Sequence, residues 1–213
     1  MTPALQRALD RADAVRTDIH DLILIAGNYH NTEMKQRLAA AYTSLALEHH
    51  EAISRLVRSE LHGSAMALVR PVFEILFNAH WMFACAKPPQ IAKIAKGKLK
   101  FPRMDKVVKE VDAAYGTHRF FETVKKRGWN AMNSYTHSGI LQLSSRFDGD
   151  SIRGNYDEAA LTEAVNATTI AVALMSRFLS VAGNRSEAAD KANALLMKLL
   201  TDLPVPPSED PVP

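Results

Sequence analysis

The strongest constraint on the fold is a long apolar stretch, from Gly63 to Ala86, that also contains charged side chains and a proline. The stretch is apolar on nearly all sides, which indicates a helix buried among other helices. Arg70, Glu74 and Asn78 are spaced four residues apart, so they form one polar line along this helix. Because a buried charge is costly unless it is paired, the sequence predicts a central helix whose polar line has a partner elsewhere in the chain.

Pro71 lies inside this predicted helix, too far from its start to be a first-turn residue. Proline has no backbone N–H, so the carbonyl oxygen of Ala67, one turn earlier, loses its usual hydrogen-bond donor. We therefore expect a kink between Ala67 and Arg70. A side chain from another element is a candidate donor to the free carbonyl.

Composition and periodicity together predict an all-α protein. The chain has 213 residues, of which 47% are hydrophobic and 23% are charged, and this suits one soluble domain with a sizeable core. We predict an up-and-down helical bundle of four long helices, with a basic insertion of short helices between helices three and four and a short C-terminal helix. The predicted domain covers residues 1–203, with the insertion at 87–156, and residues 204–213 form a disordered proline-rich tail.

Apolar periodicity and capping residues give the expected bounds of these helices. The long helices are expected at 3–25, 32–61, 64–86 and 157–181, the short ones at 91–97, 104–115, 118–126 and 129–139, and the last helix at 186–203. Asn31 or Thr32 caps the second helix, Gly63 follows its end, and Ser64 caps the third. The short turn between the first two helices predicts that they are antiparallel neighbours. We expect a loop at 142–156 and no strand.

Cysteine usage and the N-terminal sequence predict a cytoplasmic protein. Cys85 is the only cysteine, so no disulfide can form within the chain, which fits a reducing compartment. The N-terminal residues show no basic region followed by an apolar one, so we expect no signal peptide. The stretch at 64–86 is long enough to raise the question of a membrane span, but the charged side chains within it argue against insertion.

Positive charge is concentrated in the segment 87–127. The whole chain carries a net charge of +3, whereas this segment has twelve Lys or Arg residues and four acidic ones, which makes it +8 and the remainder −5. Such asymmetry favours an anionic partner such as RNA, with Lys126 and Arg127 as candidate binding residues. The alternative is a solvated, lysine-rich excursion without a ligand. Aromatic residues near these charges suit single-stranded RNA, or they pack the short helices onto the bundle.

A second polar line lies in the predicted helix at 129–139. Asn130, Asn133 and His137 recur at spacings of three and four, so they share one face. Histidine titrates near physiological pH and can act as a general acid or base, and Asn133 can hold it or a substrate. The alternative role of His137 is to hydrogen-bond the last carbonyl groups of its helix, where the helix dipole favours it.

The two polar lines define the candidate site. Arg70 presents its fork to an anionic or phosphoryl group while Glu74 orients it, or the two form an internal salt bridge that fixes the packing. The candidate catalytic residues are His137, Arg70, Glu74 and Asn133, and the candidate binding residues are Tyr135, Asn78, His50, Arg127 and Lys126.

No metal and no cofactor is expected. His49 and His50 are adjacent, so on a helix they point about 100° apart and do not readily chelate one ion. The chain also lacks the Glu-x-x-His pairs of di-metal bundles, zinc-ligand spacing and a glycine-rich phosphate loop.

Two short motifs resemble a known group of families. Ala-Leu-Val-Arg-Pro-Val-Phe-Glu at 67–74 and Tyr-Thr-His-Ser-Gly at 135–139 resemble uncharacterised bacterial all-helical families that look similar to the HEPN superfamily and to AbiV-type phage-defence proteins. The likeness spans about 38–179. It implies a homodimer in a toxin–antitoxin or anti-phage context that acts on RNA by metal-independent phosphodiester cleavage.

The spacing of arginine and histidine departs from the HEPN pattern. HEPN ribonucleases place an arginine, four to six residues and a histidine on one helix. In this chain nine residues separate Arg70 from His80 and Arg127 from His137, and three separate Arg16 from His20 and Arg58 from His62. None of these four pairs has the family's spacing.

Two hypotheses follow. In the first, the protein acts on RNA, with His137 as general acid or base, Arg70 stabilising charge on the phosphorane and Asn133 positioning the RNA. In the second, it is a non-catalytic homodimeric module that binds a partner protein or a small anionic ligand. Arg70, Glu74 and His137 then form an internal network, and Arg70→Ala is expected to lower the melting temperature sharply.

Overall fold

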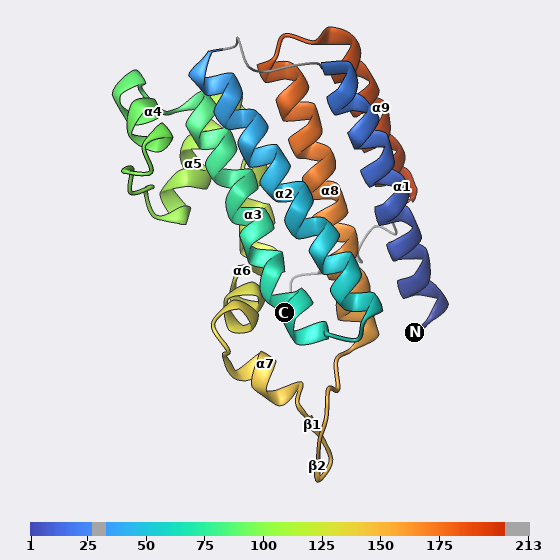
Figure 1. The fold of residues 1–213 in the computed structure, drawn as a ribbon. Coiled ribbons are helices and arrows are strands. Elements are labelled where there is room, and N and C mark those ends of the chain that lie inside the picture. Colours follow the sequence, from blue (N-terminus) through green and yellow to red (C-terminus); the bar gives the residue numbers. More distant parts are fainter. Residues whose placement is uncertain (27–32, 203–213) are drawn as a thin grey trace.

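The computed structural model describes residues 1–26 and 33–202, and these residues are largely helical (Figure 1). The helices are α1 (Pro3–Ala26), α2 (Met34–Arg58), α3 (His62–Ala84), α4 (Pro88–Ala95), α5 (Met104–Tyr115), α6 (Phe120–Thr136), α7 (Ile140–Ser144), α8 (Glu158–Ala182) and α9 (Ser186–Asp202). Strands β1 (Phe147–Asp148) and β2 (Ser151–Ile152) form an antiparallel hairpin. The all-α class is confirmed, and the small hairpin replaces part of the loop expected at 142–156.

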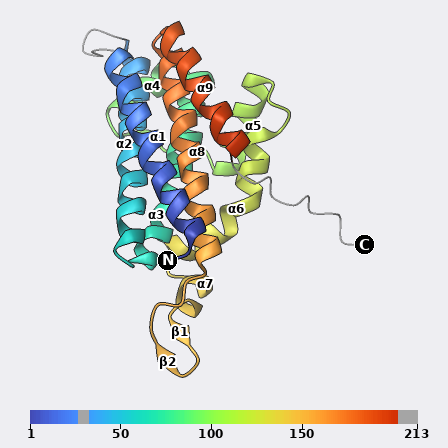
Figure 2. The same ribbon diagram turned by 90° about the vertical axis from the view of Figure 1, so that its right-hand side faces the viewer.

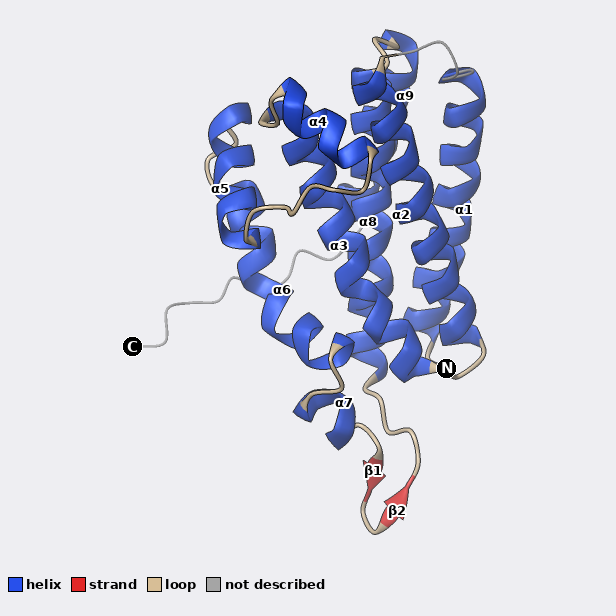
Figure 3. Cartoon of the chain, turned by 60° about the vertical axis from the view of Figure 1, so that its left-hand side comes forward, coloured by secondary structure: helices blue, strands red, loops and turns tan. Residues whose placement is uncertain are grey.

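The long helices pack around α8, which contacts α1, α2, α3 and α9 (Figures 1 and 2). On the far side of α3 lie α5 and α6, while α4 lies against α2 (Figure 3). In Figure 1 the chain runs upward along α3 and returns along α5 and α6 to the end of the bundle where α8 begins. As a result, α3 is covered on several sides by other helices, as its apolar sequence predicts.

One hydrophobic core runs through these helices. Its largest fully buried side chains include Leu9 of α1, Ile53 of α2, Phe77 of α3 and Met175 of α8. Within the described residues, α8 is the one helix long and apolar enough to cross a membrane, and 67% of its apolar window is buried inside the bundle. It is therefore packed like the core helix of a soluble protein.

The first two helices are antiparallel neighbours, as expected (Figure 1), and Arg58 of α2 pairs with Asp13 of α1, although α1 packs mainly against α8. The last helix has the expected bounds to within one residue, but with 17 residues it is not short, and it packs along α8 and α1. The predicted turn and capping residues at 27–32 and the predicted tail at 204–213 lie outside the described residues.

The turn between α2 and α3 uses residues other than those predicted. Glu60 takes the left-handed conformation, with φ of 58°, and the N–H of Leu61 donates to the carbonyl of Leu56 at 2.9 Å, which closes α2. Since α3 begins at His62, Gly63 and Ser64 lie inside its first turn rather than at the end of α2 and the cap of α3. Two caps predicted from residue type were therefore wrong.

One continuous helix, α6, replaces the two short helices expected at 118–126 and 129–139. A glycine in a helix costs about 1 kcal/mol relative to alanine, and Gly128 lies in the gap between the two expected helices. Packing outweighs that cost, because the rings of Phe121 and Trp129 lie 6.1 and 6.2 Å from the ring of Phe77 on α3. Trp129 and His137 consequently belong to one rigid helix and its C-cap.

Candidate functional site

The two predicted polar lines meet where α3 packs against α6. Nη1 of Arg70 lies 2.5 Å from Nε2 of His137. Nε and Nη2 of Arg70 lie 3.0 and 2.8 Å from Oε1 of Glu74. Because an arginine stays protonated and can only donate, Nε2 of His137 is the acceptor and Nδ1 carries the proton. The structure therefore brings Arg70, Glu74 and His137 together as one group, which we call the Arg70 cluster.

Trp129 supports the Arg70 cluster from α6. The guanidinium carbon of Arg70 lies 4.9 Å from the centre of the indole ring, and Nζ of Lys125 lies 5.3 Å from it. Such cation–π contacts hold a planar guanidinium in place. The side chain of Arg70 remains 19% exposed, and His137 is exposed, so the cluster is anchored on the indole side and open to solvent at the imidazole. Sequence reasoning treated Trp129 only as one of several aromatic residues, although it lies two turns before His137.

The carbonyl group that Pro71 leaves free is satisfied by α6. Oγ1 of Thr136 donates a hydrogen bond to the carbonyl oxygen of Ala67 at 3.1 Å, and α3 continues as one helix through Pro71. The sequence anticipated a side-chain donor at this carbonyl. Thr136 and His137 are adjacent in sequence, so two neighbouring residues of the α6 terminus bond to α3.

Thr136→Val is expected to lower the free energy of unfolding by about 1–2 kcal/mol, because it leaves the carbonyl of Ala67 without a donor. Pro71→Ala restores an N–H that can donate to the same carbonyl. Thr136→Val should therefore cost less in the Pro71→Ala background than in the wild type. Urea unfolding of the four proteins measures this difference, and an equal cost in both backgrounds would contradict the role of Thr136.

Asn78 on α3 and Asn133 on α6 do not join the cluster. Oδ1 of each amide is buried and has no hydrogen-bond partner within the described residues. Asn133 is one turn before His137, and Asn78 is one turn after Glu74, so both continue the polar lines away from the solvent-exposed imidazole. Within the described residues the side-chain amide of Asn133 makes no hydrogen bond to the imidazole of His137, and the two residues are linked only by the backbone, where the N–H of His137 donates to the carbonyl of Asn133 at 3.0 Å.

Two predicted binding residues lie elsewhere. Tyr135 is half-buried, and its ring centre lies 6.5 Å from that of Tyr156. His50 is 1% exposed, and its Nδ1 lies 3.2 Å from Oγ1 of Thr168, in the contact between α2 and α8. Burial lowers the pKa of His50 to about 4, so at neutral pH it is an uncharged core residue that is separate from the Arg70 cluster.

The acidic side chains of the segment 87–127 are all held in contacts of their own. Asp112 is buried and accepts hydrogen bonds from backbone N–H groups at the start of α6. Glu110 accepts the indole N–H of Trp81 at 2.6 Å. The ion pairs in this segment are Asp105 with Lys125, Glu110 with Lys106, and Glu122 with Arg119. These carboxylates therefore neutralise only three of the twelve basic side chains.

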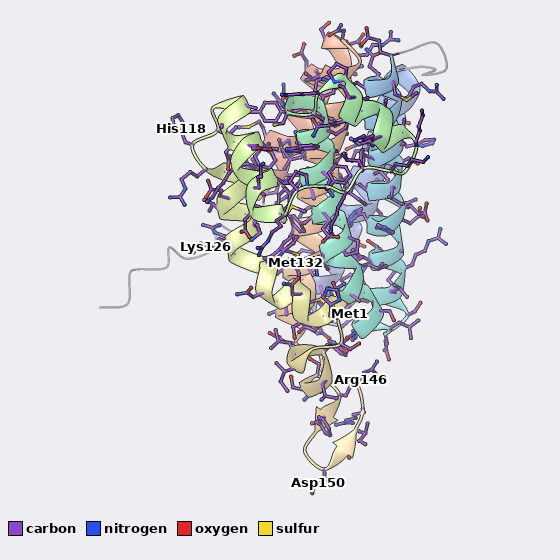
Figure 4. The ribbon with its side chains drawn as sticks, turned by 90° about the vertical axis from the view of Figure 1, so that its left-hand side faces the viewer. Met1, His118, Lys126, Met132, Arg146 and Asp150 are labelled. Carbon is purple, nitrogen blue, oxygen red and sulfur yellow. The ribbon has the colours of Figure 1, made fainter. Side chains whose placement is uncertain are left out.

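The remaining nine basic side chains form what we call the basic face of α4, α5 and α6. All nine are exposed and have no acidic partner within the part of the chain that the structure describes: Lys87, Lys93, Lys96, Lys98, Lys100, Arg103, Lys109, Lys126 and Arg127. Lys126 projects from the outer side of α6 (Figure 4). The predicted concentration of charge is thus exposed to solvent on α4, α5, α6 and the loops that join them.

A cavity of about 370 Å³ opens in the basic face between α5 and α6. Its lining includes Lys109 and Lys126 of the basic face, the ion pairs of Lys125 with Asp105 and of Arg119 with Glu122, and Trp129. Since Trp129 also contacts Arg70, the cavity and the Arg70 cluster lie next to each other on α6. Within the described residues, no three His, Cys, Asp or Glu side chains gather in a way that could hold a metal ion.

Comparisons with known proteins identify a family without a known function. A model described as "Family of unknown function (DUF6988)" matches residues 43–204, a range that includes the Arg70 cluster and the basic face. No curated protein and no solved structure matches the chain.

Proposed function

The chain belongs to the DUF6988 family of unknown function, and for this member we propose that the basic face of α4, α5 and α6 binds RNA. The observation that carries the proposal is the set of nine exposed basic side chains that have no acidic partner within the described residues. Because the nearby carboxylates are held in structural contacts, they leave this charge available to phosphate groups.

Aromatic side chains beside the charges favour single-stranded RNA over a rigid duplex. Tyr115 and Phe120, at the turn between α5 and α6, are 41% and 43% exposed. Unpaired bases stack on exposed rings of this kind, whereas bases in a duplex are already stacked. The resemblance of the motifs at 67–74 and 135–139 to HEPN and AbiV-type proteins also supports RNA as the partner and a cytoplasmic defence role.

The Arg70 cluster favours a second candidate function, which is metal-independent cleavage of the bound RNA. An arginine beside an exposed histidine can stabilise negative charge while the imidazole transfers a proton. In the observed arrangement Nε2 of His137 accepts from Arg70, so the imidazole cannot take a proton at that nitrogen until Arg70 moves away. The geometry therefore supports binding directly and cleavage only after that rearrangement. This second candidate function also implies a homodimer, as in the HEPN superfamily.

RNA binding is tested by fluorescence anisotropy with a labelled single-stranded RNA and a duplex DNA of equal length. Lys126→Ala/Arg127→Ala should weaken RNA binding several-fold and reduce the slope of log affinity against log salt by about 1–2. Lys191→Ala/Lys198→Ala, which removes the same charge from the exposed surface of α9, is the matched control and should leave both quantities unchanged. Absence of RNA binding by the wild type, or equal weakening by both variants, would contradict the proposal.

Cleavage is tested on the same samples, incubated with a chelator and run on a denaturing gel. Products that form with the wild type and are lost in His137→Ala would support the second candidate. If the RNA stays intact with both proteins, cleavage is excluded as a function, and the RNA-binding proposal is judged from the anisotropy measurements alone.

A further inference from the structure

A second cavity lies where the α2–α3 turn meets the segment that includes α7 and the hairpin. Its volume is about 310 Å³, and its polar lining consists of Glu60, His62, Ser64, Arg146, Arg153 and Tyr156. Arg146 lies where the hairpin joins the bundle (Figure 4). None of these residues belongs to the Arg70 cluster or to the basic face. We infer that this cavity, which we call the Arg146 cavity, binds a small sugar phosphate.

Arg146 and Tyr156 converge on α3 at Gly63. A Cβ atom on Gly63 would lie only 2.5 Å from Oη of Tyr156 and 3.3 Å from Nη2 of Arg146, so no larger residue fits there without displacing them. The guanidinium carbon of Arg146 lies 5.9 Å from the centre of the tyrosine ring, and His62 meets the same ring edge-on at 5.7 Å. Gln142 donates to the carbonyl of Gly63 at 3.2 Å, which holds this segment against α3. The tyrosine hydroxyl and the guanidinium are thus next to each other at the start of α3.

The hydroxyl group and the guanidinium lack partners that their chemistry requires. Oη of Tyr156 is buried and makes no hydrogen bond within the described residues, and a buried hydroxyl is destabilising unless something pairs with it. Arg153 forms an ion pair with Asp148. Arg146, in contrast, has no acidic partner within the residues that the structure describes. An acceptor with several oxygen atoms would satisfy both groups at once.

A phosphate group supplies such oxygen atoms. The planar guanidinium of Arg146 can hold two of them. The hydroxyl of Tyr156, which is buried beside that guanidinium at Gly63, can donate to a third once the Arg146 side chain shifts onto the phosphate. The start of α3 adds a favourable dipole for an anion, although the two side chains carry the inference. Glu60, also in the lining, repels a bare anion and accepts hydrogen bonds from hydroxyl groups. A sugar phosphate offers phosphate oxygens to Arg146 and Tyr156 and hydroxyl groups to Glu60. The volume of the cavity suits a ligand of that size.

Calorimetric titration with ribose 5-phosphate, at constant ionic strength, tests the Arg146 cavity. The wild type should bind ribose 5-phosphate, bind inorganic phosphate more weakly, and not bind ribose. Arg146→Gln should reduce the affinity more than tenfold. Tyr156→Phe should reduce it several-fold without lowering the melting temperature, because it removes only an unpaired hydroxyl. Arg185→Gln, on the exposed turn between α8 and α9, removes the same charge elsewhere and is the control.

The outcomes separate the parts of the inference. Failure of the wild type to bind either phosphate compound, or unchanged affinity in Arg146→Gln, would overturn the site. If inorganic phosphate binds as tightly as ribose 5-phosphate, the sugar does not contribute to the affinity, and the proposed role of Glu60 is wrong. A drop in melting temperature in Tyr156→Phe would show that the hydroxyl has a structural partner, which would overturn the argument from its unpaired state.

Discussion

Asp112→Ala is expected to lower the free energy of unfolding by about 3 kcal/mol, the sum of several lost hydrogen bonds at a buried site. The carboxylate is 6% exposed. It accepts hydrogen bonds from Oγ1 of Thr117 and from the backbone N–H groups of Phe121 and Glu122, at 2.5, 3.0 and 2.9 Å. The residue before α6, Arg119, makes no side-chain cap of its own. Asp112 on α5 therefore caps α6, and its removal leaves backbone N–H groups without acceptors.

Urea unfolding followed by circular dichroism measures the loss, with Asp105→Ala as the matched control. Asp105 is an acidic residue of the same helix, but it is exposed and pairs with Lys125 at 2.7 Å, and exposed pairs contribute little. The loss of unfolding free energy in Asp112→Asn should lie between those of the two alanine variants, because the amide keeps one acceptor oxygen. Equal effects of Asp112→Ala and Asp105→Ala would show that the cap is unimportant. Since α6 carries Trp129 and ends at His137, a loosened α6 should also weaken the Arg70 cluster.

Stability is expected to fall as the pH drops from about 6.5 to about 4, because two histidines are buried in the uncharged form. Burial lowers the pKa of His50 to about 4, and burial together with the charge of Arg177 lowers the pKa of His80 to about 4. In the unfolded chain both titrate near 6.5. Between these values the unfolded state binds more protons, so the stability is complete above pH 6.5 and is lost as the pH falls towards 4. The loss for each histidine is at most about 3 kcal/mol.

Urea unfolding at a series of pH values tests this expectation. His80 lies against the rings of Phe121 and Phe178, at 5.1 and 4.6 Å between ring centres, so His80→Phe keeps an aromatic ring and removes the titration. This variant should show a smaller loss of stability between pH 6.5 and pH 4 than the wild type. His20→Gln, an exposed position on α1, is the control and should keep the wild-type slope. The same slope in His80→Phe and the wild type would exclude His80 as a source of the pH dependence.

The fold was largely predictable because it depends on patterns within single helices. The predicted bounds of the helix at 104–115 agree with α5, and those at 3–25 agree with α1 to within one residue. The errors arose where tertiary contacts outweighed local preference. Gly128 did not break α6, because that helix packs on α3, and Gly63 did not end α2, because it leaves room for Tyr156. Residue type alone does not contain those contacts.

The candidate site was predictable in part. Charged residues four apart on an apolar helix require partners, so Arg70, Glu74 and a second polar line were identifiable, and the structure places His137 against them. The same reasoning included His50, because a histidine in a core and a histidine in a site look alike in sequence. It also missed the contact of Trp129 with Arg70 and the convergence of Arg146 and Tyr156, since nothing local relates those residues to α3.

The sequence by itself determined the all-α class, the buried α3 with its polar line, the need for a donor to the carbonyl of Ala67, and the excess of positive charge at 87–127. These follow from spacing, covalent chemistry and composition, which act along the chain. Only the tertiary structure decided which groups meet: Thr136 with Ala67, His137 with Arg70, and Tyr156 with Gly63. The reason is physical. Residues far apart in sequence become neighbours only when the helices pack, and that packing minimises the apolar surface exposed to water across the whole molecule.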